Sequence, residues 1–439
     1  RKEKEPRARE TSMAYEGRHR LGDLFKSRRE RGLPGLPTLS VTMNDGLVDR
    51  SSLDRKTDSA LSDEEHLLVR AGDIAYNTMR MWQGASGMAH KDGLVSPAYV
   101  VLAPKAAIDS RFASYLFKSQ RMIYLFWAYS YGLTADRLRL YYRDFARIPT
   151  TVPAIQEQKK FAAALVAWDK SIMVVEKMLK NLVRQRLGLF YGLLDGQFLQ
   201  KPRRQTIKVP RLESATIDSQ ENKGSFPESV QPGIPRLQPT PRGWRRRCLG
   251  LYLSEVRRPV DLEQDRQYTL VTVKRSRGGV QQRSVLRGSE IKTATQFYIR
   301  EGDFLISRRQ IVHGACGIVP SELDGAIVSN EYIAFTANEG LNMRFLRYLS
   351  ELKYFQQTCF HSSVGVHVEK MIFRAERWLR WPFNIPPICE QEGIAAILDD
   401  ATAEVDAASR QLAALRKEKL ALMQQILMSN GRATFDSVA

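Results

Sequence analysis

The segment VPAIQEQ at residues 152–158 decides the fold, because it returns as IPPICEQ at residues 385–391, 233 positions later. Single residues upstream repeat with the same offset: Tyr99, Phe112, Tyr115, Gly132 and Pro149 correspond to Tyr332, Phe345, Tyr348, Gly365 and Pro382. Farther upstream the offset is 230, where RAGDI at 70–74 matches REGDF at 300–304 and GASG at 84–87 matches GACG at 314–317. Matches that keep one order along the chain indicate an internal duplication.

Each copy of the segment opens a long stretch with the apolar spacing of an amphipathic helix. Steps of three and four alternate, as in a helix that buries a narrow seam against another helix. The seam positions are Leu165, Trp168, Ile172, Val175, Leu179, Leu182, Arg186, Leu189 and Leu193 in the first helix, and Leu398, Ala401, Val405, Ala408, Leu412, Leu415, Lys419, Leu422 and Ile426 in the second. Because the two sets share one register, we predict that the helices pair as an intramolecular antiparallel coiled coil. The alternative is that each helix packs only on its own domain.

The repeat and the composition together divide the chain. We predict a basic, disordered leader (1–19), a first globular domain (20–150), a first long helix (151–195), a proline-rich linker (196–242), a second globular domain (243–386), a second long helix (387–428) and a tail (429–439). Each helix spans about 40 residues, or roughly 60 Å at 1.5 Å per residue. The linker is expected to be extended and partly disordered, because it is rich in proline and lacks apolar patterning.

Both globular domains mix short strands with a helix. In the first domain, strands are predicted at 38–43, 73–77 and 98–102, with a helix around 111–129; in the second, they fall at 268–274, 303–307 and 332–336, with a helix around 343–359. The Gly72-Asp73 and Gly302-Asp303 pairs are expected to form tight turns leading into strands. The fold class is therefore α+β, with two tandem α/β domains that are each followed by a long helix.

The charge balance favours a polyanionic partner. The chain has 67 basic and 48 acidic residues, a net charge of +19, and nucleic acid is the commonest partner of so basic a protein. The cysteines are too scattered for a disulfide framework or a zinc site and are expected to be reduced and mostly buried. A charged start and interrupted apolar stretches favour a soluble, cytoplasmic protein without a membrane span.

Enzyme signatures are missing from the sequence. The Pro386-Pro387 pair lacks the amide and the aromatic residue of an amino-methyltransferase tetrapeptide, and no Walker-type phosphate loop occurs. The Glu-x-Lys tripeptides at 221–223 and 351–353 stand alone, and the histidines have no metal-ligand spacing. We therefore predict no catalytic residue, no metal and no cofactor in this chain.

Candidate DNA-binding residues gather in loops that are equivalent in the two repeats. Arginine, glutamine and asparagine read guanine and adenine edges in the major groove, and arginine and lysine also bind phosphates. The candidates are Asn77, Arg80, Trp82 and Gln83 after one strand; Arg308, Arg309 and Gln310 after its counterpart; Arg137, Arg139, Tyr141, Tyr142 and Arg143; and Lys274, Arg275 and Arg277. For any single residue, a solvated surface charge is an equally good interpretation, so the prediction depends on the shared placement.

This architecture resembles the specificity subunit of type I restriction–modification enzymes, from Leu21 to Leu427. The resemblance is carried by a duplicated Arg-x-Gly-Asp turn (70–73 and 300–303) and a duplicated Pro-x-x-x-Glu helix start (153–157 and 386–390). It implies a non-catalytic subunit whose two target-recognition domains each read one half of a bipartite double-stranded DNA site, while the helices set the unread spacer. The long linker and the basic leader depart from the family pattern.

The resemblance also implies partners. Two methyltransferase subunits would dock on the helices, and a restriction form would add translocase/nuclease subunits. Those partners would use S-adenosylmethionine, and ATP with magnesium in the restriction form. Two other interpretations stay open: a coiled-coil adaptor with incidental basic charge, and a relic piece of a nuclease or methyltransferase.

Overall fold

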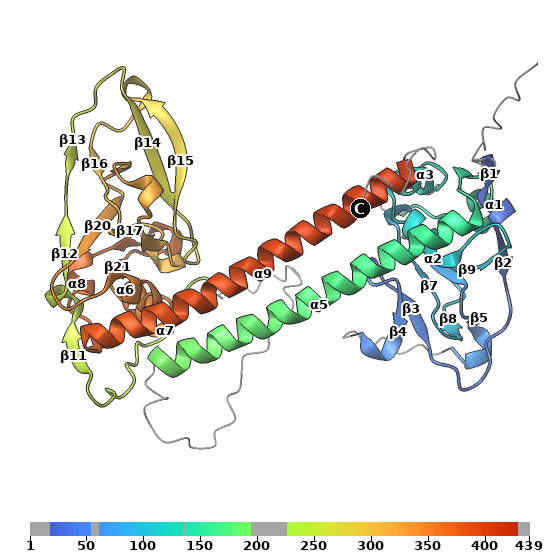
Figure 1. Ribbon diagram of the computed structural model, residues 1–439, viewed down its shortest axis with the longest axis horizontal. Helices are drawn as coiled ribbons and strands as arrows, with labels where there is room; N and C mark the ends of the chain where they lie inside the picture. Colours follow the sequence, from blue (N-terminus) through green and yellow to red (C-terminus); the bar gives the residue numbers. More distant parts are fainter. Residues whose placement is uncertain (1–17, 54–60, 135–136, 195–225, 429–439) are drawn as a thin grey trace, which may run out of the picture. The chain divides into compact units, whose positions relative to one another are not determined.

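The computed structural model of the chain describes residues 18–53, 61–134, 137–194 and 226–428 (Figure 1). The chain divides into unit 1 (Arg1–Lys177 and Ser409–Ala439) and unit 2 (Met178–Ala408). Both boundaries fall inside the long helices α5 (Ile155–Leu194) and α9 (Ile388–Met428), which are the two helices expected from the heptad pattern. Most of the predicted leader, linker residues 196–225 and the tail lie outside the described residues.

Unit 1 is built on an antiparallel sheet of four strands in the order β2-β9-β6-β7. Its elements are β1 (Arg18–Arg20), α1 (Leu21–Leu24), β2 (Phe25–Arg28), β3 (Leu39–Val41), β4 (Leu47–Asp49), β5 (Leu67–Val69), β6 (Ile74–Asn77), β7 (Ser86–Met88), β8 (Gly93–Val95), β9 (Tyr99–Pro104), α2 (Ser110–Leu116), α3 (Gln120–Ala128), α4 (Tyr142–Phe145) and β10 (Pro149–Thr151), followed by α5. Four fully buried rings, Phe25, Phe117, Phe126 and Phe145, form the centre of its core.

Unit 2 repeats this sheet as β12-β20-β17-β18 and adds a five-stranded sheet, β13-β16-β19-β14-β15. Its elements are β11 (Arg245–Cys248), β12 (Leu253–Val256), β13 (Pro259–Val260), β14 (Gln267–Val273), β15 (Val280–Arg287), β16 (Gln296–Tyr298), β17 (Phe304–Ser307), β18 (Cys316–Ile318), β19 (Ile327–Ser329), β20 (Tyr332–Ala337), α6 (Met343–Leu349), α7 (Lys353–His361), β21 (Ser363–Val364), β22 (Ile372–Phe373), α8 (Ala375–Trp378) and β23 (Pro382–Ile385), followed by α9. Trp378 is fully buried against Phe335, Phe355 and Phe373. The mixed helix–sheet class and the two tandem domains are confirmed.

Three local expectations need correction. The single helix expected at 111–129 is split into α2 and α3, because the hydroxyl of Ser119 accepts a hydrogen bond from the amide of Met122 and starts a new helix. The helix expected at 343–359 is likewise split into α6 and α7. Residues 18 and 19, predicted to belong to the leader, instead pair with β10, because backbone groups of β10 complete a two-stranded ladder with them.

The Arg-x-Gly-Asp motif forms the expected turn in both units. Gly72 and Gly302 adopt φ values of 90° and 81°, which favour glycine. The buried Asp73 carboxylate accepts hydrogen bonds from the amide of Arg70 (3.0 Å) and from Nε of Arg28 (2.7 Å). In unit 2, buried Asp303 likewise binds the amide of Arg300 (2.8 Å) and the guanidinium of Arg258 (2.6 Å). The aspartate of each motif therefore links the start of a central strand, β6 or β17, to an arginine from an earlier segment, Arg28 or Arg258.

A buried glutamine attaches each long helix to its own domain. In unit 1, Gln158 accepts a hydrogen bond from the amide of Asp109 and donates to the carbonyls of Ala107 and Pro153. In unit 2, Gln391 makes the same three bonds, with the amide of Asn342 and the carbonyls of Gly340 and Pro386. Both glutamines are completely buried. The repeated Pro-x-x-x-Glu-Gln sequence therefore encodes a repeated hydrogen-bonded joint.

Within unit 1, the two long helices contact each other in antiparallel order. Asp169 binds Nζ of Lys419 at 2.5 Å, and Glu176 binds Arg416 at 2.7 Å, so rising numbers in α5 meet falling numbers in α9. Leu165, Val175 and Leu412 on the predicted seam are buried. The half-buried seam positions of this unit are Trp168, Ile172, Leu415, Lys419 and Leu422, whereas the side chain of Ile426 is outside the described residues. Knobs-into-holes packing stays a prediction.

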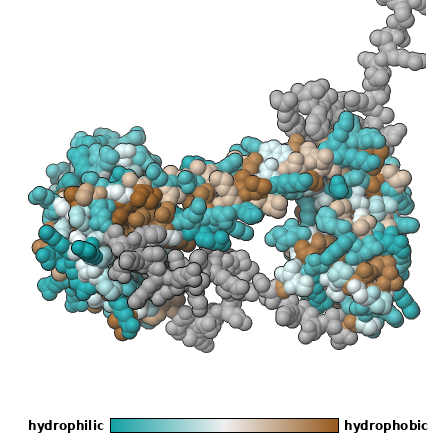
Figure 2. All heavy atoms as spheres, turned by 60° about the horizontal axis from the view of Figure 1, so that its bottom comes forward, coloured by the Kyte–Doolittle hydropathy of each residue, from teal (hydrophilic) through white to brown (hydrophobic). Residues whose placement is uncertain are grey.

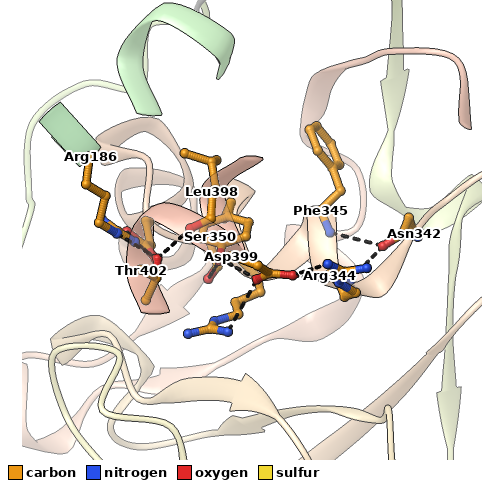
Figure 3. Close-up of polar contacts among 11 residues, drawn as sticks. Arg186, Asn342, Arg344, Phe345, Ser350, Leu398, Asp399 and Thr402 are labelled. Carbon is orange, nitrogen blue, oxygen red and sulfur yellow. Dashed lines mark hydrogen bonds and ion pairs between the residues drawn. The ribbon is translucent and has the colours of Figure 1, made fainter. Parts of the chain in front are cut away.

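Within unit 2, seam residue Arg186 of α5 reaches α9 and the domain (Figure 3). Its Nε donates to the Thr402 hydroxyl at 2.8 Å, and its terminal nitrogen donates to both oxygens of Glu351 at 2.9 and 3.0 Å. On α9 itself, the carboxylate of Asp399 accepts hydrogen bonds from Arg344 and from the Tyr348 hydroxyl. Of the other predicted seam positions here, Leu398 and Ala408 are buried and Leu179, Leu182, Leu189, Leu193, Ala401 and Val405 are half-buried.

The described end of the proline-rich segment, residues 226–242, packs on unit 2 instead of extending freely. The Phe226 and Phe360 rings lie 5.7 Å apart, and Val230 is buried. The Ser229 hydroxyl bonds to Nδ1 of His313 at 2.9 Å, and Thr240 bonds to Asn384 at 2.9 Å. Scattered apolar and hydroxyl side chains thus suffice to bind this part of the linker to the domain.

The four cysteines are free thiols, as expected. Only two of them are buried, Cys316 and Cys359, whereas Cys248 and Cys389 are exposed. Burial raises the pKa of the Cys316 thiol to about 12, so this group stays protonated and acts as a small apolar side chain. None of the described helices is long and apolar enough to cross a membrane.

Candidate nucleic-acid interface

The first candidate cluster of unit 1 lies in the loop after β6. The amide oxygen of Asn77 accepts a hydrogen bond from the amide of Met79, and the Trp82 indole donates to the Met79 carbonyl. These two side chains therefore shape the loop with their polar atoms. Arg80 is exposed and Gln83 is half-buried. The loop leaves these two as its available base-reading groups.

The second cluster of unit 1 lies directly beside the first. The amide of Leu140 donates to the carbonyl of Thr78 at 2.9 Å, which joins the 137–143 segment to the loop after β6. Within that segment, exposed side chains are contributed by Arg137, Arg139, Tyr141 and Arg143. Tyr142 differs, because it is half-buried and its hydroxyl donates to the carbonyl of Phe25 at 3.0 Å. The structure thus gives Tyr142 a role in the fold.

In unit 2, the loop after β17 has the same construction. A short 3-10 turn, Ile311–His313, ends at Gly314 with a φ of 77°, as the Met81–Gln83 turn of unit 1 ends at Gly84 with a φ of 84°. Arg308 and Gln310 are half-buried, and the Arg308 Nε and Gln310 Oε1 atoms have no hydrogen-bond partner among the described residues. Arg309 is exposed and pairs with Glu331 at 2.8 Å.

The third cluster, on the β14–β15 hairpin, packs against this loop. The amides of Ser276 and Arg277 donate to the carbonyls of His313 (2.7 Å) and Gly314 (2.9 Å). Ser276 and Arg277 have φ values of 54° and 60°, a left-handed conformation that costs about 1–2 kcal/mol for each non-glycine residue. The two hydrogen bonds offset that strain. They hold the exposed side chains of Lys274, Arg275 and Arg277 beside Arg308 and Gln310.

In unit 2, a carboxylate from a third loop contacts both the β14–β15 hairpin and the loop after β17, and we call this meeting of hairpin and loop the junction. Glu369 pairs with Arg275 at 2.8 Å and lies 3.2 Å from Nε2 of His313. Burial and the nearby Arg275 lower the pKa of His313, while Glu369 raises it in part. His313 therefore stays mainly neutral near pH 7, and its buried imidazole packs between the hairpin and the loop.

Lys118, which is not among the residues predicted from the sequence, forms the corresponding junction in unit 1. The ammonium group of Lys118 donates to the carbonyls of Met43 (2.9 Å) and Gly84 (2.6 Å), joining the β3–β4 turn to the loop after β6. Burial lowers the pKa of this amine, and Asp45 opposes the shift in part. The equivalent residue in unit 2 is Glu351, whose carbonyl accepts a bond from Arg277 at 3.3 Å.

The duplicated glycine motif carried the signal for this junction. A Cβ atom on Gly87 would lie 2.1 Å from the amide nitrogen of Leu47 in the hairpin of unit 1. On Gly317 it would lie 3.1 Å from Cα of Gly279 in the hairpin of unit 2. The second glycine of GASG and GACG therefore allows the hairpin to approach closely; the approach excludes a side chain at Gly87 and leaves little room for one at Gly317.

The candidate loops present surfaces that suit a polyanion. The visible face of each unit is mostly hydrophilic (Figure 2). In the part of the chain that the structure describes, no three histidine, cysteine or acidic side chains gather in a way that would hold a metal ion. What converges instead is arginine, lysine and glutamine on backbone loops of fixed shape, the side chains that read base edges and phosphates.

One family model and several solved structures are similar to this chain. Residues 259–417 match the family model for the type I restriction modification DNA specificity domain. The S subunit of a type I restriction-modification system from M. genitalium has a similar fold, with a TM-score of 0.53, 11% identity, and coverage of 96% of this chain and 98% of that chain. The HsdS subunit from Thermoanaerobacter tengcongensis aligns over 94% of this chain and 97% of its own, with 14% identity and a TM-score of 0.43. No curated protein matches the sequence.

Proposed function

We propose that this chain recognises a bipartite double-stranded DNA sequence as the non-catalytic subunit of a type I restriction–modification complex, because residues 259–417 match the model of that family's DNA specificity domain. Unit 1 reads one half of the site, and unit 2 reads the other. One observation supports this most: each unit joins the same hairpin and strand-end loops, yet the side chains on them differ. By the 230-residue offset, Gln310 and His313 of unit 2 stand where Arg80 and Gln83 stand in unit 1, and Arg308 and Arg309 stand where unit 1 has Thr78 and Met79.

Partner subunits perform the chemistry. Two methyltransferase subunits bind this chain and use S-adenosylmethionine, and a restriction form adds translocase/nuclease subunits that use ATP and magnesium. This chain itself holds no cofactor in the proposal and works in the cytoplasm, where its DNA is. The long helices set the length of the unread spacer between the two half-sites.

The first test is selection of duplexes from a random library by the purified full chain. We expect a motif of two short conserved blocks separated by a spacer of constant length. An adaptor with incidental charge would enrich no bipartite motif. A chain that methylated or cut DNA without partners would contradict the non-catalytic assignment and support the relic enzyme.

Substitutions in one unit should alter only one block of the motif. We expect Gln310→Ala and Arg308→Ala to relax specificity in one block, costing about 1–3 kcal/mol, or roughly 5- to 150-fold, of discrimination against the wrong base. Gln83→Ala should relax only the other block. Arg257→Ala removes an exposed cation of unit 2 that lies outside the candidate loops, and it should leave both blocks unchanged. Changes spread over both blocks would contradict a modular reader.

Lengthening both helices should lengthen the spacer alone. Seven residues inserted after Lys177 in α5 and seven after Ala408 in α9 keep the heptad register and add about 10 Å to each helix. At roughly 34 Å for each turn of B-DNA, that corresponds to about three base pairs. Selection with this variant should return the same two blocks, farther apart. An unchanged spacer would show that the helices do not set it.

A further inference from the structure

Each unit projects one fully exposed aliphatic side chain from an equivalent loop. Leu133 in unit 1 has a relative exposure of 102%, and Val366 in unit 2 has 95%. They are the two most exposed large apolar side chains among the described residues, and the 233-residue offset of the repeat relates them. A single exposed apolar residue needs no explanation. The same extreme at the same place in two diverged copies calls for one.

Backbone pairing closes the loop that carries each of the two residues. The loop of unit 1 is closed by the Tyr131–Arg139 bridge, and that of unit 2 by the pairing of β21 with β22. A Cβ atom on Gly132 would lie 2.4 Å from the carbonyl oxygen of Arg137, and one on Gly365 would lie 2.8 Å from Cα of Met371. The glycine before each aliphatic residue thus permits the two arms of the loop to pack closely beneath the tip.

Both tips belong to the candidate DNA-binding surface. The arm that returns from Leu133 bonds to the loop after β6 through Leu140, and the arm that returns from Val366 bonds to the loop after β17 through Phe373 and the carbonyl of Arg308. Exposed cations follow each tip: Arg137, Arg139 and Arg143 in unit 1, and Lys370 and Arg374 in unit 2. The acidic Glu369 near the second tip is paired with Arg275.

We propose that Leu133 and Val366 are apolar wedges that enter the base stack of the DNA, one in each half-site. Proteins that bend DNA insert aliphatic side chains between base pairs while neighbouring cations hold the phosphates. A fully exposed aliphatic tip followed by exposed cations fits that use, and the other exposed apolar side chains of the two loops are less exposed: Tyr131 and Tyr141 in unit 1, and Val364 and Ile372 in unit 2. The inference rests on the proposed function and adds residues that bind DNA through neither charge nor base-edge hydrogen bonds.

The test uses the full chain and the duplex that it selects, with 2-aminopurine placed at each half-site position in turn. This base fluoresces more strongly when it is unstacked. We expect a rise at one or two adjacent positions in each half-site. Leu133→Ser should abolish the rise in one half-site and Val366→Ser in the other, each with a roughly tenfold loss of affinity. The conservative Leu133→Met and Val366→Ile variants should retain both signals.

Two controls separate insertion from folding and from general apolarity. Leu33→Ser in unit 1 and Leu251→Ser in unit 2 alter apolar residues that are 54% and 61% exposed and lie outside the candidate loops, so they should change neither signal. The midpoint of thermal unfolding should be unchanged in the tip variants, because their side chains are already in water.

The possible failures are distinguishable. If the chain selects a bipartite duplex but Leu133→Ser and Val366→Ser alter neither fluorescence nor affinity, the wedge is overturned and the proposed function stands. If replacing a thymine by uracil weakens binding and no position becomes unstacked, the tips contact thymine methyl groups from the groove, which also overturns the wedge. If no bipartite duplex is selected, both the proposed function and the wedge fail.

Discussion

Replacing Asp303 by alanine is expected to lower the free energy of unfolding of unit 2 by about 3–5 kcal/mol, because it leaves a partly buried cation without its partner. The Asp303 side chain is only 2% exposed and binds Arg258 through two nitrogens, at 2.6 and 3.1 Å. The substitution also removes the acceptor for the amide of Arg300. Urea denaturation of the full chain, followed by a probe in each unit, measures the loss.

A nearby aspartate offers a matched control. Asp324 also pairs with an arginine of this motif, Arg300 at 3.3 Å, but its side chain is 44% exposed. Asp324→Ala should therefore destabilise unit 2 far less, since exposed ion pairs contribute little. Asp73→Ala should reproduce the large effect in unit 1, where Asp73 pairs with Arg28. Equal losses for Asp303→Ala and Asp324→Ala would contradict the assignment of the buried pair as the stabilising one.

Replacing Gln391 by alanine is expected to lower the free energy of unfolding of unit 2 by about 3 kcal/mol or more. The amide of Asn342 and the carbonyls of Gly340 and Pro386 would lose their hydrogen-bond partner together. A buried backbone group without a partner costs about 1–3 kcal/mol. Thermal unfolding and hydrogen exchange of the Asn342 amide would report the change, and Gln158→Ala should do the same for unit 1.

The neighbouring residue separates loss of the joint from loss of helix propensity. Glu392 lies in the same turn of α9 and is exposed. Its change to alanine removes a side chain similar in size to that of Gln391. Glu392→Ala should have an effect near zero, because alanine is the best helix former. If it destabilises unit 2 as much as Gln391→Ala does, the three hydrogen bonds are not the cause.

The features that could be predicted from the sequence are those written in local patterns. The heptad spacing predicted α5 and α9, and the repeated glycine-aspartate pairs predicted both turns. These features depend on residues within a few positions of one another, so periodicity and turn chemistry suffice for them.

The assembly of the candidate interface could not be predicted in the same way. The hairpin with Arg275, the loop with Arg308 and the loop with Glu369 are separated by more than 30 residues at each step. They meet through backbone hydrogen bonds and through the ion pair of Arg275 with Glu369, neither of which the local sequence reveals. Sequence reasoning also included Tyr142 among the readers, although its hydroxyl is bound to the carbonyl of Phe25. A side chain's sequence neighbours do not reveal whether its polar atom faces solvent or the chain.

The glutamine joint has a consequence for how such a protein changes over generations. Gln158 and Gln391 bond only to backbone groups, so the joint tolerates almost any side chains on the loops that it anchors. A gene crossover within the codons of the two Glu-Gln pairs would exchange one whole globular domain for another and preserve the joint in the chimera. A new recognised DNA sequence would thereby arise from a single genetic event. Stepwise substitution of a core would instead pass through variants that do not fold.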